Sequence, residues 1–239
     1  MKNSKHLCAL LCAAALLIGT ALTGCGSAAV GGQKKQPSWV GHYPDYAAEL
    51  AKFNDVTADS MTDEQLQQIL ALITDGEYKI ADVFWFNEVT AIDPEAPRLP
   101  IDDTYILYPN DDFTCVQDIR DLICSVYTGR EAYRMLGYID DTRNTVYDPT
   151  KDDISMADAW GARLYYVDYK GKLYYANYAS GPMMPYDYHP EKATIKERFT
   201  KQSTIQFILP STVAVDNSEE DLYGSLIKTR DGWRLETWY

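Results

Sequence analysis

The sequence predicts an α+β domain in which N-terminal helices pack on a curved antiparallel β-sheet formed mainly by the C-terminal half. Three observations lead to this fold class. Helical patterns with clear start signals lie before residue 137, and segments with a period of two residues follow residue 163. Pairs of those segments flank Lys170-Gly171 and Asp231-Gly232, dipeptides typical of hairpin turns. Helices first and antiparallel strands last is the order of an α+β fold.

The strongest helix signal begins at Thr62. Gln65 follows three positions later and completes a capping box, while Met61 and Leu66 are placed as a hydrophobic staple. Apolar residues then recur at helical spacing: Leu66, Ile69, Leu70 and Ile73. We expect the helix to end near Gly76, because glycine commonly follows the last helical turn.

Further helices are predicted over residues 44–53, from Thr114 to residue 127 and from Thr128 to Gly137. Proline near the first turn favours the earliest of these helices. Thr114 and Thr128 are each followed three positions later by Gln or Glu, which is the signature of a helix start.

Strands are predicted wherever β-branched and aromatic residues gather without helical spacing. They cover residues 79–89, 105–108, 163–169, 172–178, 194–200, 204–209, 212–215, 222–229 and 233–239. The last segment alternates two sets of residues, so we expect one set to face a core. The sets are Trp233, Leu235, Thr237 and Tyr239 against Arg234, Glu236 and Trp238.

Residues 1–24 carry the pattern of a secretory signal. Lys2 and Lys5 precede an apolar stretch over residues 7–18, which is shorter than the roughly 20 residues that span a bilayer. Leu22-Thr23-Gly24-Cys25 resembles the bacterial lipobox. We therefore expect Cys25 to carry a lipid anchor that holds the protein at the extracytoplasmic face of the membrane. The alternative is an ordinary signal peptide with a chance cysteine.

The remaining chain divides into a tether and a folded part. Residues 25–41 hold the lipidated cysteine and a small, polar, flexible segment. Residues 42–239 are expected to form a single α+β domain, with two lobes, 42–110 and 111–239, as the alternative division. The chain has 22 basic and 35 acidic residues, a net charge of −13. This balance argues against nucleic acid as a partner and favours a basic protein.

Cys115 and Cys124 are the cysteines of the predicted folded part. If both lie on one helix, their spacing places them on opposite faces and about 13 Å apart along the axis. A disulfide does not close that gap, and a bridge requires a helix that begins well after Cys115.

Sequence motifs of catalysis are missing from the chain. It has no glycine-rich phosphate loop, no G-x-S-x-G and no H-E-x-x-H. We therefore expect a protein with no catalytic residues, no metal and no cofactor. Three minor alternatives remain open: calcium at the acidic doublets, a Cys124–His189 nucleophile–base pair, and a pair of carboxylates suited to glycoside hydrolysis.

Tyrosines are unusually dense between residues 165 and 188. They are Tyr165, Tyr166, Tyr169, Tyr174, Tyr175, Tyr178, Tyr186 and Tyr188. Most are expected to fill a sheet, but residues 181–190 contain three prolines and are predicted as a stiff loop. We expect Met183, Met184, Tyr186 and Tyr188 to form a partner-binding projection. The alternative is that the two methionines tuck under the sheet.

The order of motifs resembles that of a known family over residues 80–239. The motifs are the helix over 113–127, the hairpin through Gly171-Lys172-Leu173-Tyr174, Thr194-Ile195-Lys196 and the terminal Asp231-Gly232-Trp233-Arg234-Leu235. This order resembles the IseA-type DL-endopeptidase inhibitors and, more loosely, cystatin-like and NTF2-like domains.

The resemblance implies a surface protein that binds NlpC-type cysteine peptidases of the cell wall. These enzymes cut the D-glutamyl–diaminopimelate bond of peptidoglycan, and such an inhibitor plugs their cleft. The resemblance transfers no contact residues to this chain. Two other classes of function remain: a small-molecule-binding lipoprotein with an NTF2-like cone, and an enzyme of unrecognised type.

Overall fold

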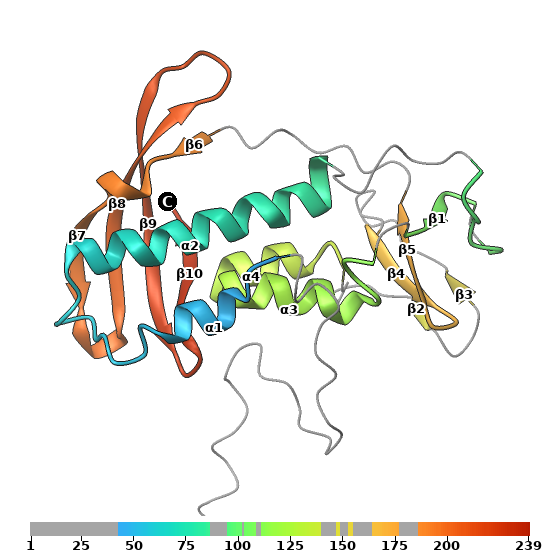
Figure 1. Cartoon of the computed structure of the whole chain (residues 1–239), viewed down its shortest axis with the longest axis horizontal. Helices are drawn as coiled ribbons and strands as arrows, with labels where there is room; N and C mark the ends of the chain where they lie inside the picture. Colours follow the sequence, from blue (N-terminus) through green and yellow to red (C-terminus); the bar gives the residue numbers. More distant parts are fainter. Residues whose placement is uncertain are drawn as a thin grey trace, which may run out of the picture. The chain divides into compact units, whose positions relative to one another are not determined.

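Helices lie across a curled antiparallel sheet in the C-terminal half of the chain, which confirms the predicted α+β class (Figure 1). The structure is a computed structural model. It describes residues 43–86, 95–101, 103–108, 111–139, 147–148, 153–154, 164–176 and 186–239. All of them belong to one of the chain's two units, Lys34–Tyr239. The predicted signal segment and Cys25 lie outside the described residues, as do Met183 and Met184.

Helices α1 (Tyr46–Ala51) and α2 (Asp63–Ala81) begin where the sequence predicts. The Asp45 side chain caps α1 by accepting a hydrogen bond from the Ala48 amide at 3.0 Å. The capping box of α2 is confirmed, because the amide of Gln65 donates to the Thr62 hydroxyl and the amide of Thr62 donates to the Gln65 side chain.

The end of α2 differs from the prediction. The helix runs past Gly76 to Ala81 and continues as a π-helical turn, η1 (Asp82–Phe86), so the strand predicted over 79–89 is wrong as far as residue 86. Gly76 serves close packing, because a Cβ at this position would overlap the Val126 side chain. Burial of Ile80 and Phe84 against the core outweighs the weak strand preference of this segment.

Helices α3 (Val116–Val126) and α4 (Gly129–Leu136) have the expected extents. The N-cap residue of α3 is Cys115 and not the predicted Thr114, whereas Thr128 is the N-cap residue of α4 as predicted. Thr114 donates to Asp118 through both its amide and its hydroxyl, and Asp168 of a neighbouring strand accepts from the Val116 amide at 3.0 Å. The Thr128 side chain makes no capping hydrogen bond. Cys115 directly precedes α3, Cys124 lies within it, and both cysteines are half-buried.

A small antiparallel sheet combines β1 (Tyr105–Leu107), β5 (Lys172–Ala176) and β4 (Tyr166–Tyr169) in that order. The predicted hairpin at Lys170-Gly171 is confirmed, with φ of 49° and 75° at the two turn residues. Both faces of this sheet are buried. Ile106, Tyr166, Leu173 and Tyr175 join the main core, and Tyr105, Val167, Tyr169, Tyr174 and Ala176 join a second cluster. Elsewhere, β2 (Tyr147–Asp148) pairs with β3 (Asp153–Ile154).

The larger sheet has the order β10-β9-β8-β6, and β7 also pairs with β8. Its strands are β6 (Tyr186–Tyr188), β7 (Thr194–Phe199), β8 (Thr204–Val213), β9 (Glu219–Thr229) and β10 (Gly232–Trp238). Two predictions are corrected here. The segments predicted over 204–209 and 212–215 join into β8, and part of the predicted loop 181–190 is β6. Pro210 is tolerated within β8 because its missing N–H falls where β8 passes from β7 to β6.

A β-bulge in β10 alters the predicted alternation. Trp233 and Leu235 are fully buried, as expected. The register shifts between Leu235 and Thr237, so Trp238 lies opposite Gly224 and packs against the core. Tyr239 belongs to the same alternating set as Trp233 and Leu235, but it is 70% exposed. The bulge therefore brings Trp238 to the side of the sheet that α2 covers.

Candidate functional site

Strand β6 carries two of the residues singled out from the sequence, and α2 holds it in place. The amide of Tyr188 donates to the Tyr78 hydroxyl at 3.1 Å. That hydroxyl lies 3.3 Å from the Tyr186 carbonyl and 3.5 Å from an Asp187 carboxylate oxygen, either of which accepts its proton. Burial raises the pKa of Tyr78, which keeps the donor protonated. The extension of α2 beyond Gly76 is what places Tyr78 beside β6.

Tyr188 lies inside an aromatic stack. Its ring stacks on Trp238 at 5.8 Å between centroids and contacts Tyr78 at 5.5 Å. Tyr186 stacks on the outer side at 6.4 Å. Gly224 permits the close approach of Trp238, because a Cβ there would overlap both that ring and Phe207. The structure thus places Tyr188 in packing and leaves Tyr186 half-exposed at the end of the stack.

A buried carboxyl group lies at the inner end of this stack. Glu77 is 4% exposed and continues the buried face of α2, four positions after Ile73. Its Oε1 accepts hydrogen bonds from the Tyr127 hydroxyl at 3.0 Å and from Trp238 Nε1 at 2.9 Å. The Tyr188 hydroxyl faces the same carboxyl, but Oε2 has no hydrogen bond of ordinary geometry. Glu77, Tyr127, Tyr188 and Trp238 are called the Glu77 cluster below.

Burial sets the protonation of the Glu77 cluster. It raises the pKa of Glu77 from 4.5 to about 7, against the hydrogen bonds from Trp238 and Tyr127, which lower it. The nearby Glu131 carboxylate adds to the rise, although Arg134 pairs with Glu131 at 2.8 Å. Burial also raises the pKa of Tyr127 and Tyr188 well above the ordinary value, so both remain donors.

The chemistry open to the Glu77 cluster follows from its enclosure. A carboxyl that exchanges a proton near neutral pH is a frequent feature of active sites. Glu77, however, is enclosed by the rings that hydrogen-bond to it, and a catalytic group has to touch its substrate. In the described structure, the cluster instead joins four parts of the fold: α2, β6, β10 and the segment between α3 and α4.

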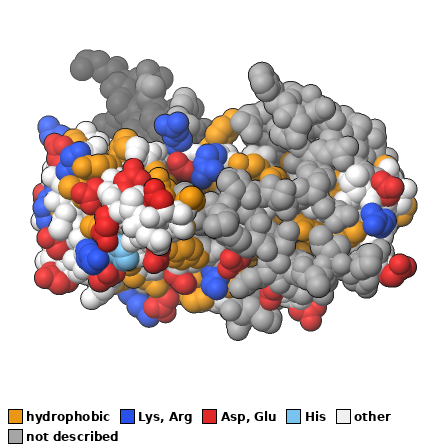
Figure 2. Space-filling view, turned by 90° about the horizontal axis from the view of Figure 1, so that it is seen from above, with side chains coloured by type: hydrophobic (Ala, Val, Ile, Leu, Met, Phe, Trp, Pro, Cys, Tyr) orange, Lys and Arg blue, Asp and Glu red, His pale blue; other side chains and the backbone are white. Residues whose placement is uncertain are grey.

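Outside the stack, the surface at this end of the larger sheet is acidic. Asp187 on β6 and Glu219, Glu220 and Asp221 on β9 are all exposed. The Tyr186 hydroxyl faces the Glu220 carboxylate, and partial burial together with this carboxylate raises the pKa of Tyr186. Figure 2 shows acidic side chains, interspersed with lysine and arginine, on the side of the molecule where this sheet lies.

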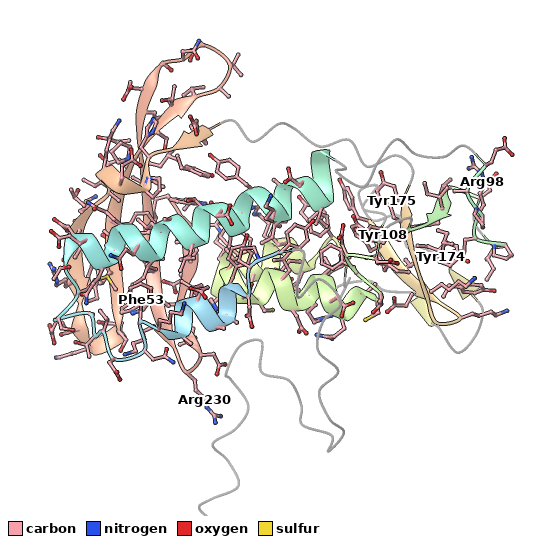
Figure 3. The ribbon with its side chains drawn as sticks, in the orientation of Figure 1. Phe53, Arg98, Tyr108, Tyr174, Tyr175 and Arg230 are labelled. Atoms are coloured by element: carbon pink, nitrogen blue, oxygen red, sulfur yellow. The ribbon has the colours of Figure 1, made fainter. Side chains whose placement is uncertain are left out.

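A second group of note lies in the small sheet, where Figure 3 labels Tyr108, Tyr174 and Tyr175. The rings of Tyr108 and Tyr175 flank Tyr166 at 5.9 and 5.7 Å. Both flanking hydroxyls are buried without a hydrogen-bond partner among the described residues. Burial raises the pKa of Tyr175 to about 12, so this hydroxyl stays neutral.

Sequence reasoning found part of the candidate site. It selected Tyr186 and Tyr188, but it missed Glu77, because Gly76 was interpreted as the helix end, and it missed Trp238, because the bulge is invisible in the alternation. The four-residue spacing from Ile73 to Glu77 was the available signal. Within the described ranges, no three His, Cys, Asp or Glu side chains are grouped as a metal site. None of the described helices is long and apolar enough to cross a membrane.

The fold defines the class of the protein as α+β, with helices covering a curled antiparallel sheet. No protein-family model matches the chain, and a search of curated proteins finds no match.

Proposed function

We propose that this protein is a lipid-anchored, extracytoplasmic inhibitor that binds NlpC-type DL-endopeptidases of the cell wall. The lipobox-like segment ending at Cys25, the acidic composition and the order of motifs over residues 80–239 support this proposal. In this role the protein acts by occupying the cleft of its partner. A tether over residues 25–41 keeps it at the membrane surface, where newly exported wall enzymes pass.

The observation that carries the proposal is the way Tyr186 is presented. Strand β6 pairs with β8 on one side, with Tyr186 opposite Val213, and is bonded to Tyr78 of α2 on the other. Tyr188 supports the Tyr186 ring from within. The backbone beneath Tyr186 is therefore fixed before any partner arrives, so less conformational entropy is lost on docking.

The surroundings of Tyr186 favour a protein partner with basic groups. Asp187 and Glu220 flank a half-exposed aromatic ring. An aromatic anchor bordered by charge is a common arrangement at the centre of protein interfaces, where tyrosine is enriched. In this proposal Tyr186 touches the partner and Tyr188 positions it.

Replacing Tyr186 with alanine tests the proposal. We expect Tyr186→Ala to weaken binding to an NlpC-type peptidase by about tenfold or more, since interface anchors contribute upwards of 1 kcal/mol. Titration calorimetry with the acylated full-length protein in detergent measures the change. Tyr133→Ala removes an exposed ring from α4, 54% accessible, and serves as the matched control.

Equal affinity of the Tyr186 and Tyr133 variants would remove Tyr186 from the interface. No binding by the unaltered protein to any peptidase of this type from the same envelope would remove the proposed function itself.

The runner-up function is binding of a small molecule. The buried hydroxyls of Tyr108 and Tyr175, which lack partners among the described residues, favour it because a polar ligand would satisfy them. If the protein binds a small molecule, adding that ligand should raise the melting temperature. The double variant Tyr108→Phe with Tyr175→Phe should then show no rise in melting temperature with ligand.

A further inference from the structure

The β8–β9 hairpin extends beyond the strand that covers the rest of β9. Strand β9 begins at Glu219, but β10 pairs with it only from Gly224 onwards, and the last contact is the Tyr239 amide donating to the Tyr223 carbonyl at 2.8 Å. Strand β8 lies on the other side of β9 along this whole stretch. Figure 1 shows the hairpin reaching past the helices. Among the described residues, 219–222 therefore have no neighbouring strand on the β10 side.

In an antiparallel sheet, the backbone groups of successive residues point alternately to the two neighbouring strands. The pairing of β9 with β8 therefore decides which residues direct their amide and carbonyl groups to this open side. Pro210, opposite Asp221, directs its carbonyl to the His189 amide at 2.9 Å and so away from β9. In an antiparallel ladder, both members of such a pair direct their amide and carbonyl groups outward. Glu219, Asp221 and Tyr223 are two positions apart, so their backbone groups point to the same side of β9. The Tyr223 carbonyl does accept a hydrogen bond there, from the Tyr239 amide. The open edge thus presents the amide and carbonyl groups of Glu219 and Asp221.

The side chains of residues 219–221 are all acidic, and Lys196 of β7 lies over the ring of Tyr223, with its Nζ 4.5 Å from the ring centroid. Glu219 and Asp221 project on one face and Glu220 on the other, because successive side chains alternate, and all three are exposed. Residues 212–223 contain no lysine or arginine. Opposite charges across a strand pair contribute roughly 0.2–1 kcal/mol each, and like charges destabilise by similar amounts.

We propose that residues 219–221 of β9 accept an extended, lysine- or arginine-bearing segment of a protein partner as an added strand. The backbone groups of Glu219 and Asp221 supply the ladder, and the three carboxylates select basic side chains on both faces. A second copy of this chain is a poor occupant, because pairing two such edges sets carboxylates against carboxylates. The inference rests on the proposed function in one respect, namely that the segment belongs to the bound peptidase.

The position of the edge fits the surface around Tyr186. Strands β6, β8 and β9 are consecutive in the sheet, so β6 and the acidic edge are separated by about 10 Å, or two strand spacings. Glu220 already faces the Tyr186 hydroxyl. One partner can therefore contact Tyr186 and add a strand to β9 together.

A synthetic peptide tests strand addition without the peptidase. The probe is a capped hexapeptide of alternating lysine and threonine, added to the full-length protein in detergent, and the readout is hydrogen exchange of single amides by NMR. We expect the peptide to slow exchange of the Glu219 and Asp221 amides by about tenfold or more. A peptide of the same sequence in which every backbone amide is N-methylated has the same charge but has no N–H to donate to the ladder, and should leave exchange unchanged. Equal protection by both peptides, or none by either, overturns the inference.

Charge reversal supplies the matched variants. Glu219→Lys with Asp221→Lys should abolish binding of the lysine peptide. Asp55→Lys with Asp59→Lys changes the charge equally at exposed positions after α1 and should leave binding intact. Unchanged binding to the first variant contradicts the inference.

A backbone variant separates this inference from the proposed function. Asp221→Pro removes an outward amide and leaves the β8 ladder intact. If Asp221→Pro inhibits a peptidase as well as the unaltered chain while Tyr186→Ala does not, the edge inference fails and the function stands. If the edge binds the lysine peptide but the protein binds no peptidase, the function fails and the edge stands.

Discussion

At the scale of single residues, Glu77 shows how one buried carboxyl can join several elements. Its Oε1 accepts hydrogen bonds from Tyr127 and Trp238, and the Tyr188 hydroxyl faces the same carboxyl group. Such a group is tolerated best while it carries its proton, because burial penalises the charged form far more than the neutral one. Its ionisation should therefore destabilise the folded state, because the cost of burying the charge exceeds the gain from stronger hydrogen bonds to Tyr127 and Trp238.

The sign of the pH dependence follows from the raised pKa. Between pH 4.5 and about 7 the folded protein keeps the Glu77 proton while the unfolded chain has lost it. The free energy of unfolding should fall as pH rises through this window, by about 3 kcal/mol once the pH exceeds the raised pKa. Glu77→Gln mimics the protonated form and should lack this decline.

Urea unfolding at a series of pH values measures this difference. Glu197→Gln, at an exposed position of β7, is the control and should follow the unaltered protein. Parallel stability curves for the Glu77→Gln variant and the unaltered protein would show that Glu77 does not titrate between the two states.

At the scale of elements, the length of α2 is set by its contact with α3. Gly76 permits the approach of Val126, and the five further residues of α2 carry Glu77 and Tyr78 to the site. A helix that ended at Gly76 would leave β6 without its partner.

Gly76→Ala should reveal this contact. Overpacking against Val126 is expected to destabilise the protein by about 1–3 kcal/mol, offset only in part by the roughly 1 kcal/mol that alanine contributes to helix propensity. In a Val126→Ala background the clash is gone, so the same substitution should become stabilising. Denaturant unfolding of the four proteins of this double-mutant cycle measures the effect of Gly76→Ala on the free energy of unfolding in each background. A stabilising effect in both backgrounds would show that Gly76 is an ordinary helix position.

The same elements show what the sequence can predict. The helix start at Thr62 was predictable because its cap bonds to a residue three positions away, whereas the Asp45 cap of α1 was not recognised. The end of α2 was not predictable, since it depends on Val126, fifty positions later. Strand β6 was missed because its partner, β8, follows it at a distance, and the bulge in β10 has no marker in the alternation. Composition alone indicated Tyr186 and Tyr188, whereas Glu77 and Trp238 required the fold.

At the scale of the whole molecule, the net negative charge and the surface at one end of the larger sheet both favour the proposed binding of a basic protein partner. The chain has a net charge of −13, and the exposed acids of β6 and β9 surround the half-exposed Tyr186. A negative surface speeds encounter with a basic partner and repels copies of itself. In the proposed function, the aromatic ring of Tyr186 and the open acidic edge of β9 would supply specificity for that partner.

The most direct test is a titration of a purified NlpC-type DL-endopeptidase with the acylated protein, following cleavage of the D-glutamyl–diaminopimelate bond in a muropeptide. Our account predicts that activity falls in proportion to added protein and reaches its floor at one molecule per enzyme. Cleavage that continues unchanged at a molar excess, or cleavage by the protein alone, would contradict it.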